Sequence, residues 1–211
     1  MKLGRFVLGA CLGLSTVASA QAGTLTTTWS DWNGPANPGY SGGVGTLTPD
    51  AASQFPATLY IDNTGSSYGG LYGSFYYTGA ADADFKLNSS LQGDASSLTL
   101  SVTTAGNSFT QQPTLAIGGQ SYAFDTQTAS GAGDIGGFAG QLLTFTWDLS
   151  GLGAFAAGSP YEIDWTFGAH AAFTQFSTTQ EIATAAVPEP AACAMMLAGL
   201  VGVGAMARRR P

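Results

Sequence analysis

The sequence predicts an all-β protein in which two antiparallel sheets pack face to face as a sandwich, with a jelly-roll-like strand arrangement preferred. Three observations favour this class. Apolar and polar residues alternate along several short stretches, clusters of Gly and Pro separate the stretches, and no helical periodicity of useful length precedes residue 191. An up-and-down barrel stays open, because alternation alone does not distinguish a sheet that packs on another from one that closes on itself. An outer-membrane barrel is disfavoured, because the many serines and threonines leave no continuous lipid-facing set.

The clearest alternation occurs in three stretches, at residues 97–103, 142–149 and 161–167. In the third, apolar residues occupy every second position from Tyr161 to Phe167. Because successive side chains of a strand point to opposite faces, each stretch buries one face and exposes the other. We therefore expect the rings of Trp147 and Trp165 to lie in the core.

A pair of glycines predicts a hairpin. Residues 114–117 and 120–124 flank Gly118 and Gly119, which readily take the positive φ angles of a two-residue primed turn. Weaker strand predictions cover residues 24–29, 58–61, 71–77, 84–88, 171–176 and 181–185. The Gly-rich and Pro-rich stretches at 33–45 and 131–140 are expected to be loops.

The amino terminus has the pattern of a secretory signal peptide over residues 1–20. Lys2 and Arg5 precede an apolar run, and the small residues Ala18 and Ala20 precede the expected cleavage point before Gln21. Signal peptidase is therefore an expected partner. The two cysteines, Cys11 and Cys193, both lie in terminal segments. The body, residues 21–186, must then be stabilised by its hydrophobic core without a disulfide.

The carboxyl terminus, residues 187–211, combines three features in a fixed order. A Pro-Glu-Pro triplet is followed by an uncharged run over 191–207, and that run by three arginines; the residues are Pro188, Glu189, Pro190, Arg208, Arg209 and Arg210. A helix of this length spans roughly 25 Å, near the lower limit for crossing a hydrocarbon core of about 30 Å. The arginines should stay cytoplasmic, and the prolines should leave an extended strip on the far side of the membrane.

This order of features resembles the PEP-CTERM sorting signal, which is read by exosortase, a membrane-embedded protease. The resemblance covers about 25 residues at the carboxyl end. It implies export across the inner membrane, transient anchoring there through the 191–207 helix, removal of the tail, and a final place at the cell surface or outside the cell. It further implies association with exopolysaccharide and biofilm. It does not assign any particular activity to the body. The alternative is an ordinary single-pass anchor that is never cut.

The body is strongly acidic. Residues 21–186 contain ten aspartates and two glutamates against a single basic residue, Lys86, which gives a net charge of −11. Such a surface repels nucleic acid and anionic lipid, because it offers no cluster of cations to hold phosphate. Divalent cations and neutral glycans are better expected partners, with extracellular polysaccharide the leading one.

The body contains few candidate catalytic residues. The one histidine, His170, stands between two alanines and is expected to be a core-edge or turn residue. The Gly-rich stretch 131–137 lacks the lysine and following helix of a phosphate-binding loop. We therefore expect no enzymatic activity, although a secreted glycan hydrolase remains an alternative.

Three carboxylates form a candidate calcium site, at Asp148, Glu162 and Asp164. If strands 142–149 and 161–167 pair through the loop between them, Asp148 lies opposite Glu162, with Asp164 further along the same polar face. Calcium or a shared proton would relieve their repulsion, and a glycosidase pair would have a similar arrangement. If the strands belong to different sheets, the three carboxylates are only solvated. No other cofactor is expected.

Aromatic residues concentrate in the first half of the body, at Trp29, Trp32, Tyr40, Tyr68, Tyr72, Tyr76 and Tyr77. Exposed rings beside polar side chains can stack on sugars, so Trp29, Trp32 and Tyr40 are candidate glycan-binding residues, with core packing as the alternative for many of the rings. These observations leave three alternative functions. An exported surface or matrix protein with a structural or adhesive role is preferred, a lectin-like glycan-binding module is the first alternative, and a glycan hydrolase is the second.

Overall fold

The structure is a computed structural model that describes residues 23–32, 37, 43–152 and 155–183. Residues 21–184 form one compact unit. The predicted signal peptide with Ala18 and Ala20, the Pro-Glu-Pro triplet, the 191–207 helix, the terminal arginines and Tyr40 lie outside the described residues. Within those residues, no helix has the length and apolar character needed to cross a membrane.

The described part of the chain forms thirteen strands. They are β1 Gly23–Trp29, β2 Gly45–Leu47, β3 Ala57–Asp62, β4 Gly70–Tyr72, β5 Phe75–Tyr77, β6 Ala83–Ser90, β7 Ala95–Gly106, β8 Phe109–Ile117, β9 Gln120–Ala123, β10 Thr126–Ile135, β11 Phe138–Asp148, β12 Pro160–Phe167 and β13 Ala171–Ile182. The all-β prediction is confirmed.

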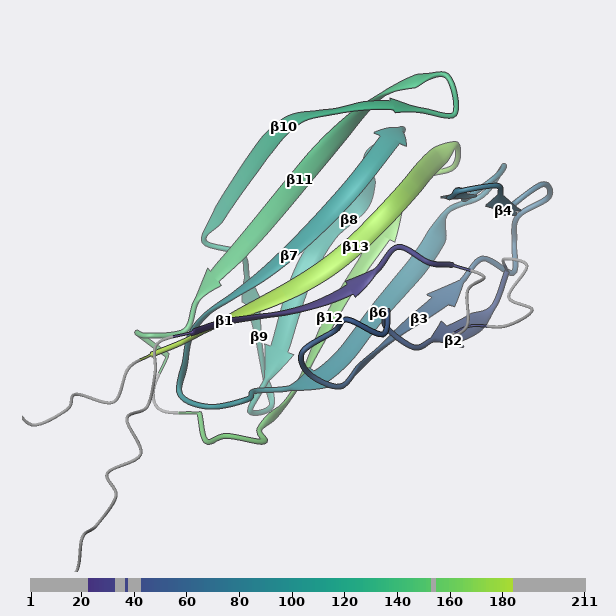
Figure 1. Ribbon diagram of the computed structural model, residues 1–211. Coiled ribbons are helices and arrows are strands. Elements are labelled where there is room, and N and C mark those ends of the chain that lie inside the picture. Colours follow the sequence, from purple (N-terminus) through teal and green to yellow (C-terminus); the bar gives the residue numbers. More distant parts are fainter. Residues whose placement is uncertain (1–22, 33–36, 38–42, 153–154, 184–211) are drawn as a thin grey trace, which may run out of the picture. The chain divides into compact units, whose positions relative to one another are not determined.

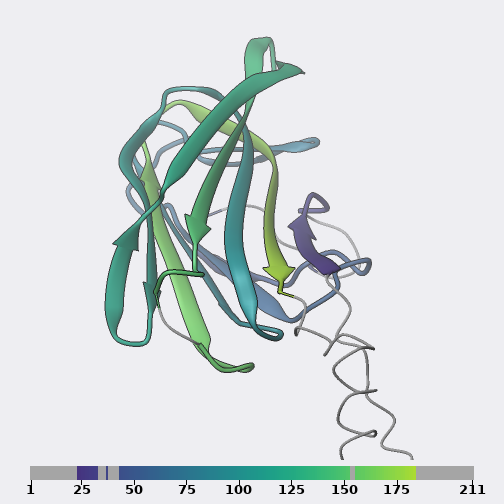
Figure 2. The ribbon, with the colours of Figure 1, turned by 90° about the vertical axis from the view of Figure 1, so that its left-hand side faces the viewer.

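The strands build two antiparallel sheets (Figure 1). Sheet A has the order β10-β11-β7-β13-β5-β4, and β1 also pairs with β13; sheet B has the order β2-β3-β6-β12-β8-β9. The last strand, β13, lies between β5 and β7, while β12 lies between β6 and β8. The chain crosses repeatedly between the sheets, while β2–β3, β4–β5, β8–β9 and β10–β11 are antiparallel pairs within one sheet. Figure 2 shows β1 beside the end of β13, where residues 23–29 pair with residues 182–176.

The core lies between the two sheets and contains the inward residues that the alternation predicted. Trp147 is 0% exposed and Trp165 is 1% exposed, so their predicted burial is confirmed. The Trp165 ring stacks on Phe85, with ring centroids 5.5 Å apart and an interplanar angle of 5°. Aromatic stacking of this kind adds to the stabilisation from buried apolar area.

The predicted turn at Gly118 and Gly119 is confirmed, with φ angles of 61° and 78°. Other boundaries differ. The stretch 71–77 is not one strand but the hairpin β4–β5, and the two stretches predicted at 171–176 and 181–185 belong largely to one strand, β13. The expected loop at 131–140 is wrong, because β10 and β11 form a hairpin that turns at Gly136 and Gly137. Glycines have no side chains to alternate, so the period-two signal is missing there.

Candidate functional site

The outer face of sheet A carries rows of hydroxyl side chains. Cross-strand pairing aligns Thr126, Thr146, Thr99, Thr179 and Thr26 in one row that runs across five strands. The next row contains Thr128, Thr144, Ser101, Ser177 and Thr28. In β7 and β11 these residues alternate with inward apolar residues, so the same period that fills the core also generates this polar face. In β1 and β13 the buried positions also include the polar residues Thr27, Thr178 and Gln180.

Hydroxyls of adjacent strands bind one another within the rows. The distance between the side-chain oxygens is 3.1 Å for Thr26 and Thr179 and 3.2 Å for Thr99 and Thr146. Each hydroxyl can both donate and accept, and the threonines of the central strands remain partly exposed. The rows therefore present an uncharged surface that can exchange hydrogen bonds with another polar molecule.

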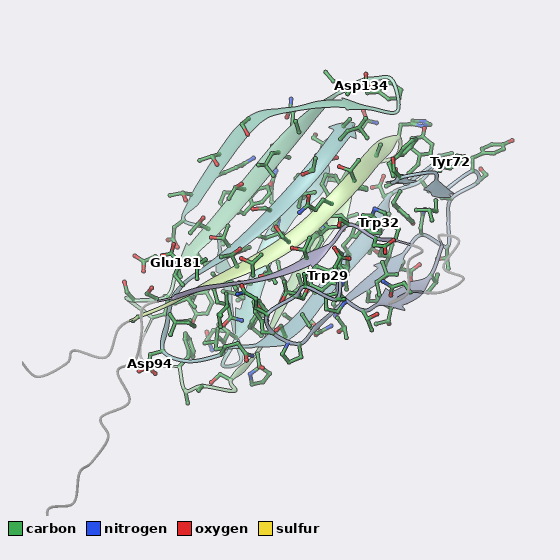
Figure 3. All side chains as sticks on the ribbon, in the orientation of Figure 1. Trp29, Trp32, Tyr72, Asp94, Asp134 and Glu181 are labelled. Carbon is green, nitrogen blue, oxygen red and sulfur yellow. The ribbon has the colours of Figure 1, made fainter. Side chains whose placement is uncertain are left out.

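At one end of this face the polar rows give way to an aromatic hollow of about 250 Å³. Its lining residues are Tyr72, Phe75, Tyr77, Phe138 and Ala172. Tyr72 is 46% exposed and Phe138 is 57% exposed, which is unusual for large rings in a domain whose core holds most of its aromatics. Figure 3 shows Tyr72 and the hairpin residue Asp134 at the same end of the strands, with Glu181 at the opposite end.

The hollow exists because the β10–β11 hairpin reaches toward β5. Its tip extends beyond the end of β7 (Figure 1), and Ile135 packs against Ala105 and Ala172 of the central strands. Gly136 makes this approach possible, since a Cβ atom there would lie only 2.9 Å from the ring of Phe75. The hairpin thereby places Phe138 beside rings that are about 60 residues earlier in the chain.

The rings of the hollow are held in defined orientations. Tyr72 stacks on Phe75 with centroids 6.1 Å apart and meets Tyr77 edge to face at 84°. The Tyr72 hydroxyl donates to the carbonyl oxygen of Tyr68 at 2.7 Å. The Tyr77 hydroxyl lies 2.6 Å from Nδ1 of His170. A ring fixed in this way loses little side-chain freedom when a ligand stacks on it.

Two residues with left-handed backbone conformations support these tyrosines. Among the described residues, Tyr68 and His170 are the non-glycine positions with positive φ, at 68° and 65°. Each contacts one tyrosine of the hollow through the hydrogen bonds above. Such conformations cost energy for residues with a Cβ and concentrate at functional sites. His170 lies in the turn between β12 and β13, so its prediction as a turn residue is confirmed.

The predicted sugar-stacking tryptophans are in the wrong place for that role. Trp29 is 2% exposed and Trp32 is 3% exposed, and their indole nitrogens donate to Leu47 O at 3.3 Å and to Thr174 O at 3.2 Å. Both rings belong to the core, so neither can stack on a ligand. The third candidate, Tyr40, lies outside the described residues.

The expected pairing of the Asp148 strand with the Glu162 strand is also wrong. Asp148 ends β11 in sheet A and lies opposite Ser97, whereas Glu162 and Asp164 lie on β12 in sheet B. Sequence neighbours often pair, but the connection after β11 crosses between the sheets. The Asp148 carboxylate accepts hydrogen bonds from the hydroxyl and backbone nitrogen of Ser150, which lower its pKa.

Lys86 relieves the charge of the other two carboxylates. Its Nζ atom lies 3.1 Å from Glu162 Oε1 and 3.6 Å from Asp164 Oδ1. Partial burial, followed by the neighbouring Glu162, raises the pKa of Asp164, and the hydrogen bond to Glu162 raises the pKa of Lys86. In the part of the chain that the structure describes, no group of three or more His, Cys, Asp or Glu side chains could hold a metal ion. Lys86 thus supplies positive charge beside Glu162 and Asp164, two of the three carboxylates of the expected calcium site.

The carboxyl-terminal segment matches a known family. Residues 186–210 match the PEP-CTERM protein-sorting motif, as the resemblance of that segment implied. This motif marks the chain as an exported protein. Among curated proteins, none matches the sequence.

Solved structures with similar folds include two carbohydrate-binding modules. A module specific for non-crystalline cellulose, CBM28, matches with 9% identity and a TM-score of 0.32, covering 68% of this chain and 83% of that chain. TmCBM61 in complex with beta-1,4-galactotriose matches with 9% identity and a TM-score of 0.30, covering 72% of this chain and 90% of that chain. Similarity at this level does not bear on what this chain binds.

Proposed function

We propose that this exported protein acts at the cell surface or in the extracellular matrix by binding a neutral polysaccharide through the outer face of sheet A. The observation that carries the proposal is the aromatic hollow beside the hydroxyl rows, with Tyr72 and Phe138 about half exposed. Sugar rings present apolar C–H faces that stack on aromatic rings and hydroxyls that exchange hydrogen bonds with polar side chains. A structural or adhesive role would then follow from attachment to the glycan.

Charge favours an uncharged glycan. The one basic residue of the body, Lys86, lies on β6 of sheet B and is engaged by two carboxylates. Asp134 lies at the hairpin tip, at the same end of the strands as Tyr72 (Figure 3). With a body net charge of −11, the potential around the hollow repels uronate-containing or sulfated chains. Neutral hexose polymers meet no such barrier.

A hydrolase function has less support. Glu162 and Asp164 both contact Lys86, and they project from the outer side of sheet B. Asp148 lies in the other sheet and accepts hydrogen bonds from Ser150. None of the three lines the aromatic hollow. We therefore favour binding without turnover.

Replacing Tyr72 or Phe138 by alanine is expected to weaken binding to a neutral glycan by about tenfold or more, corresponding to roughly 1.4 kcal/mol or more for an anchoring ring. The probes are soluble neutral β-glucans and galactans, measured by calorimetry and by retardation in glycan-containing gels. Tyr60→Ala is the matched control, because Tyr60 lies on the outer face of sheet B, and its affinity should not change. Equal affinities in the wild type and both hollow variants would place the site elsewhere, and preferential binding of an anionic glycan would contradict the charge argument.

Processing by exosortase belongs to the same proposal, and intact-mass measurement checks it. The exported protein should lack the residues before Gln21 and those after the Pro-Glu-Pro region, because both ends carry processing signals. Substituting Pro188, Glu189 and Pro190 by alanines should leave the protein in the membrane fraction with its tail. Recovery of uncut wild-type protein from the membrane would support a permanent anchor instead.

A further inference from the structure

The strands at the borders of the two sheets, β1, β2, β4, β9 and β10, differ in length and protection. At three borders the strand is very short, with three residues in β2, three in β4 and four in β9. The border strand β10 is longer, with ten residues, almost all of them exposed. Short edge strands are a common protection against pairing with another chain, and β10 does not have it.

The free side of β1, by contrast, is covered by another segment of the same chain. The segment Asp50–Gln54 covers it: Gln54 N donates to Thr26 O at 2.9 Å, Asp50 N donates to Thr28 O at 2.8 Å, and Thr28 N donates to Ser53 Oγ at 3.0 Å. No segment among the described residues covers the outer edge of β10 in this way. Strand β10 also lacks lysine and proline, the residues with which edge strands of many proteins prevent pairing with another chain.

We propose that β10 is a self-association edge, at which two copies of this protein pair their β10 strands antiparallel about a two-fold axis. The straight part of the strand runs from Thr126 to Gly131, before the irregularity between Gly131 and Gly133. The pairing joins the two copies of sheet A into one continuous sheet, in the manner of strand addition. A two-fold contact of this kind is self-complementary and closes at the dimer.

The side chains of β10 suit this arrangement. An axis at Thr128 places Thr128 opposite its own copy and Thr126 opposite Ser130 of the partner subunit. Within the protein the same face already forms hydroxyl pairs across strands, at 3.1 Å for Thr26 with Thr179 and 3.2 Å for Thr99 with Thr146. The dimer therefore continues the hydroxyl rows across the joint with the same kind of contact.

Charge also favours β10 over the rest of the surface. Two copies with a body charge of −11 each repel one another in general, but residues 126–133 carry no ionisable side chain. With the axis at Thr128, Asp125 lies opposite Gly131 of the partner subunit, and Asp134 lies beyond the paired segment. Acidic side chains are thus not brought opposite one another along the joint.

Sedimentation velocity of the exported protein, from micromolar to millimolar concentration and without glycan, tests the proposal. We expect a reversible dimer whose dissociation constant rises by about tenfold, or ~1.4 kcal/mol, in Thr128→Lys, because two lysines meet at the axis. Ala123→Lys on the short strand β9 is the matched control. It reduces the net negative charge equally, so it should leave dimerisation unchanged or slightly stronger. Tyr72→Ala should also leave it unchanged, which separates this proposal from the glycan site.

A disulfide measurement does not depend on the folding of the lysine variant. The body contains no cysteine, so Thr128→Cys introduces a single thiol close to its copy across the axis. A disulfide-linked dimer is expected for Thr128→Cys under oxidising conditions and not for Ala123→Cys. A wild-type protein that stays monomeric at millimolar concentration, or dimerisation that both lysine variants reduce equally, would overturn the proposal.

Discussion

Replacing Trp165 by alanine is expected to lower the free energy of unfolding of the body by about 3–5 kcal/mol, a large part of the total for a domain of this size. The ring is 1% exposed and lies against Phe85 and Phe176, with centroid distances of 5.5 and 5.6 Å. Alanine would leave a cavity between the sheets that rigid neighbouring strands cannot close. Urea unfolding of residues 21–186, followed by circular dichroism, measures the change. A loss below about 1 kcal/mol would show that the ring does not fill the core.

Phenylalanine substitutions separate ring volume from hydrogen bonding. The indole nitrogen of Trp147 donates to Tyr122 O at 3.1 Å, whereas that of Trp165 is buried without a partner among the described residues. Trp147→Phe removes the hydrogen bond to the part-buried carbonyl of Tyr122, while Trp165→Phe removes an unsatisfied donor. We therefore expect Trp147→Phe to be the more destabilising by about 1 kcal/mol. The reverse order would show that ring packing outweighs the hydrogen bond.

The core could be predicted because its strands have simple patterns. Trp147 and Trp165 belong to strands with neighbours on both sides, so each has one face in the core and one in solvent, and the period of two survives in the sequence. In β1 the pattern is weaker. Thr27 points inward and donates to Phe55 O at 2.8 Å, so a polar residue occupies a core position before Trp29. The sequence therefore does not indicate that the ring of Trp29 faces the core.

The sequence indicates that the candidate site contains aromatic residues, but it does not indicate how they come together. The aromatic-rich first half did contain Tyr72 and Tyr77, but the hollow also needs Phe138 from a hairpin that was expected to be a loop. That contact depends on how the β10–β11 tip extends past β7, which no local pattern encodes. The carboxylate site failed for a similar reason. Alternation indicates which face a residue occupies and does not indicate the sheet, and β11 and β12 lie in different sheets.

Gly106→Ala is expected to destabilise the body by about 2–5 kcal/mol, combining a left-handed backbone strain of about 1–2 kcal/mol with overpacking of about 1–3 kcal/mol. Gly106 ends β7 with a φ of 86°, and a Cβ atom there would overlap the backbone carbonyl oxygen of His170. Gly158→Ala is the matched control. Its φ is 84° and a Cβ atom there would meet nothing within 4 Å, so only the strain applies. Equal losses of unfolding free energy in the two variants would show that the turn at His170 moves away from the added Cβ atom at no cost.

Gly106→Ala should also disturb the candidate site. Gly106 lets the turn before β13 come close to β7, and that turn holds His170 Nδ1 within 2.6 Å of the Tyr77 hydroxyl. Displacing the turn should therefore weaken glycan binding under conditions in which Gly106→Ala is still folded, while Gly158→Ala should bind normally. His170→Gly distinguishes the two effects, because glycine keeps the left-handed backbone without strain and removes the imidazole. We expect His170→Gly to unfold no more easily than the wild type and to bind more weakly; unchanged affinity would show that the imidazole does not position Tyr77.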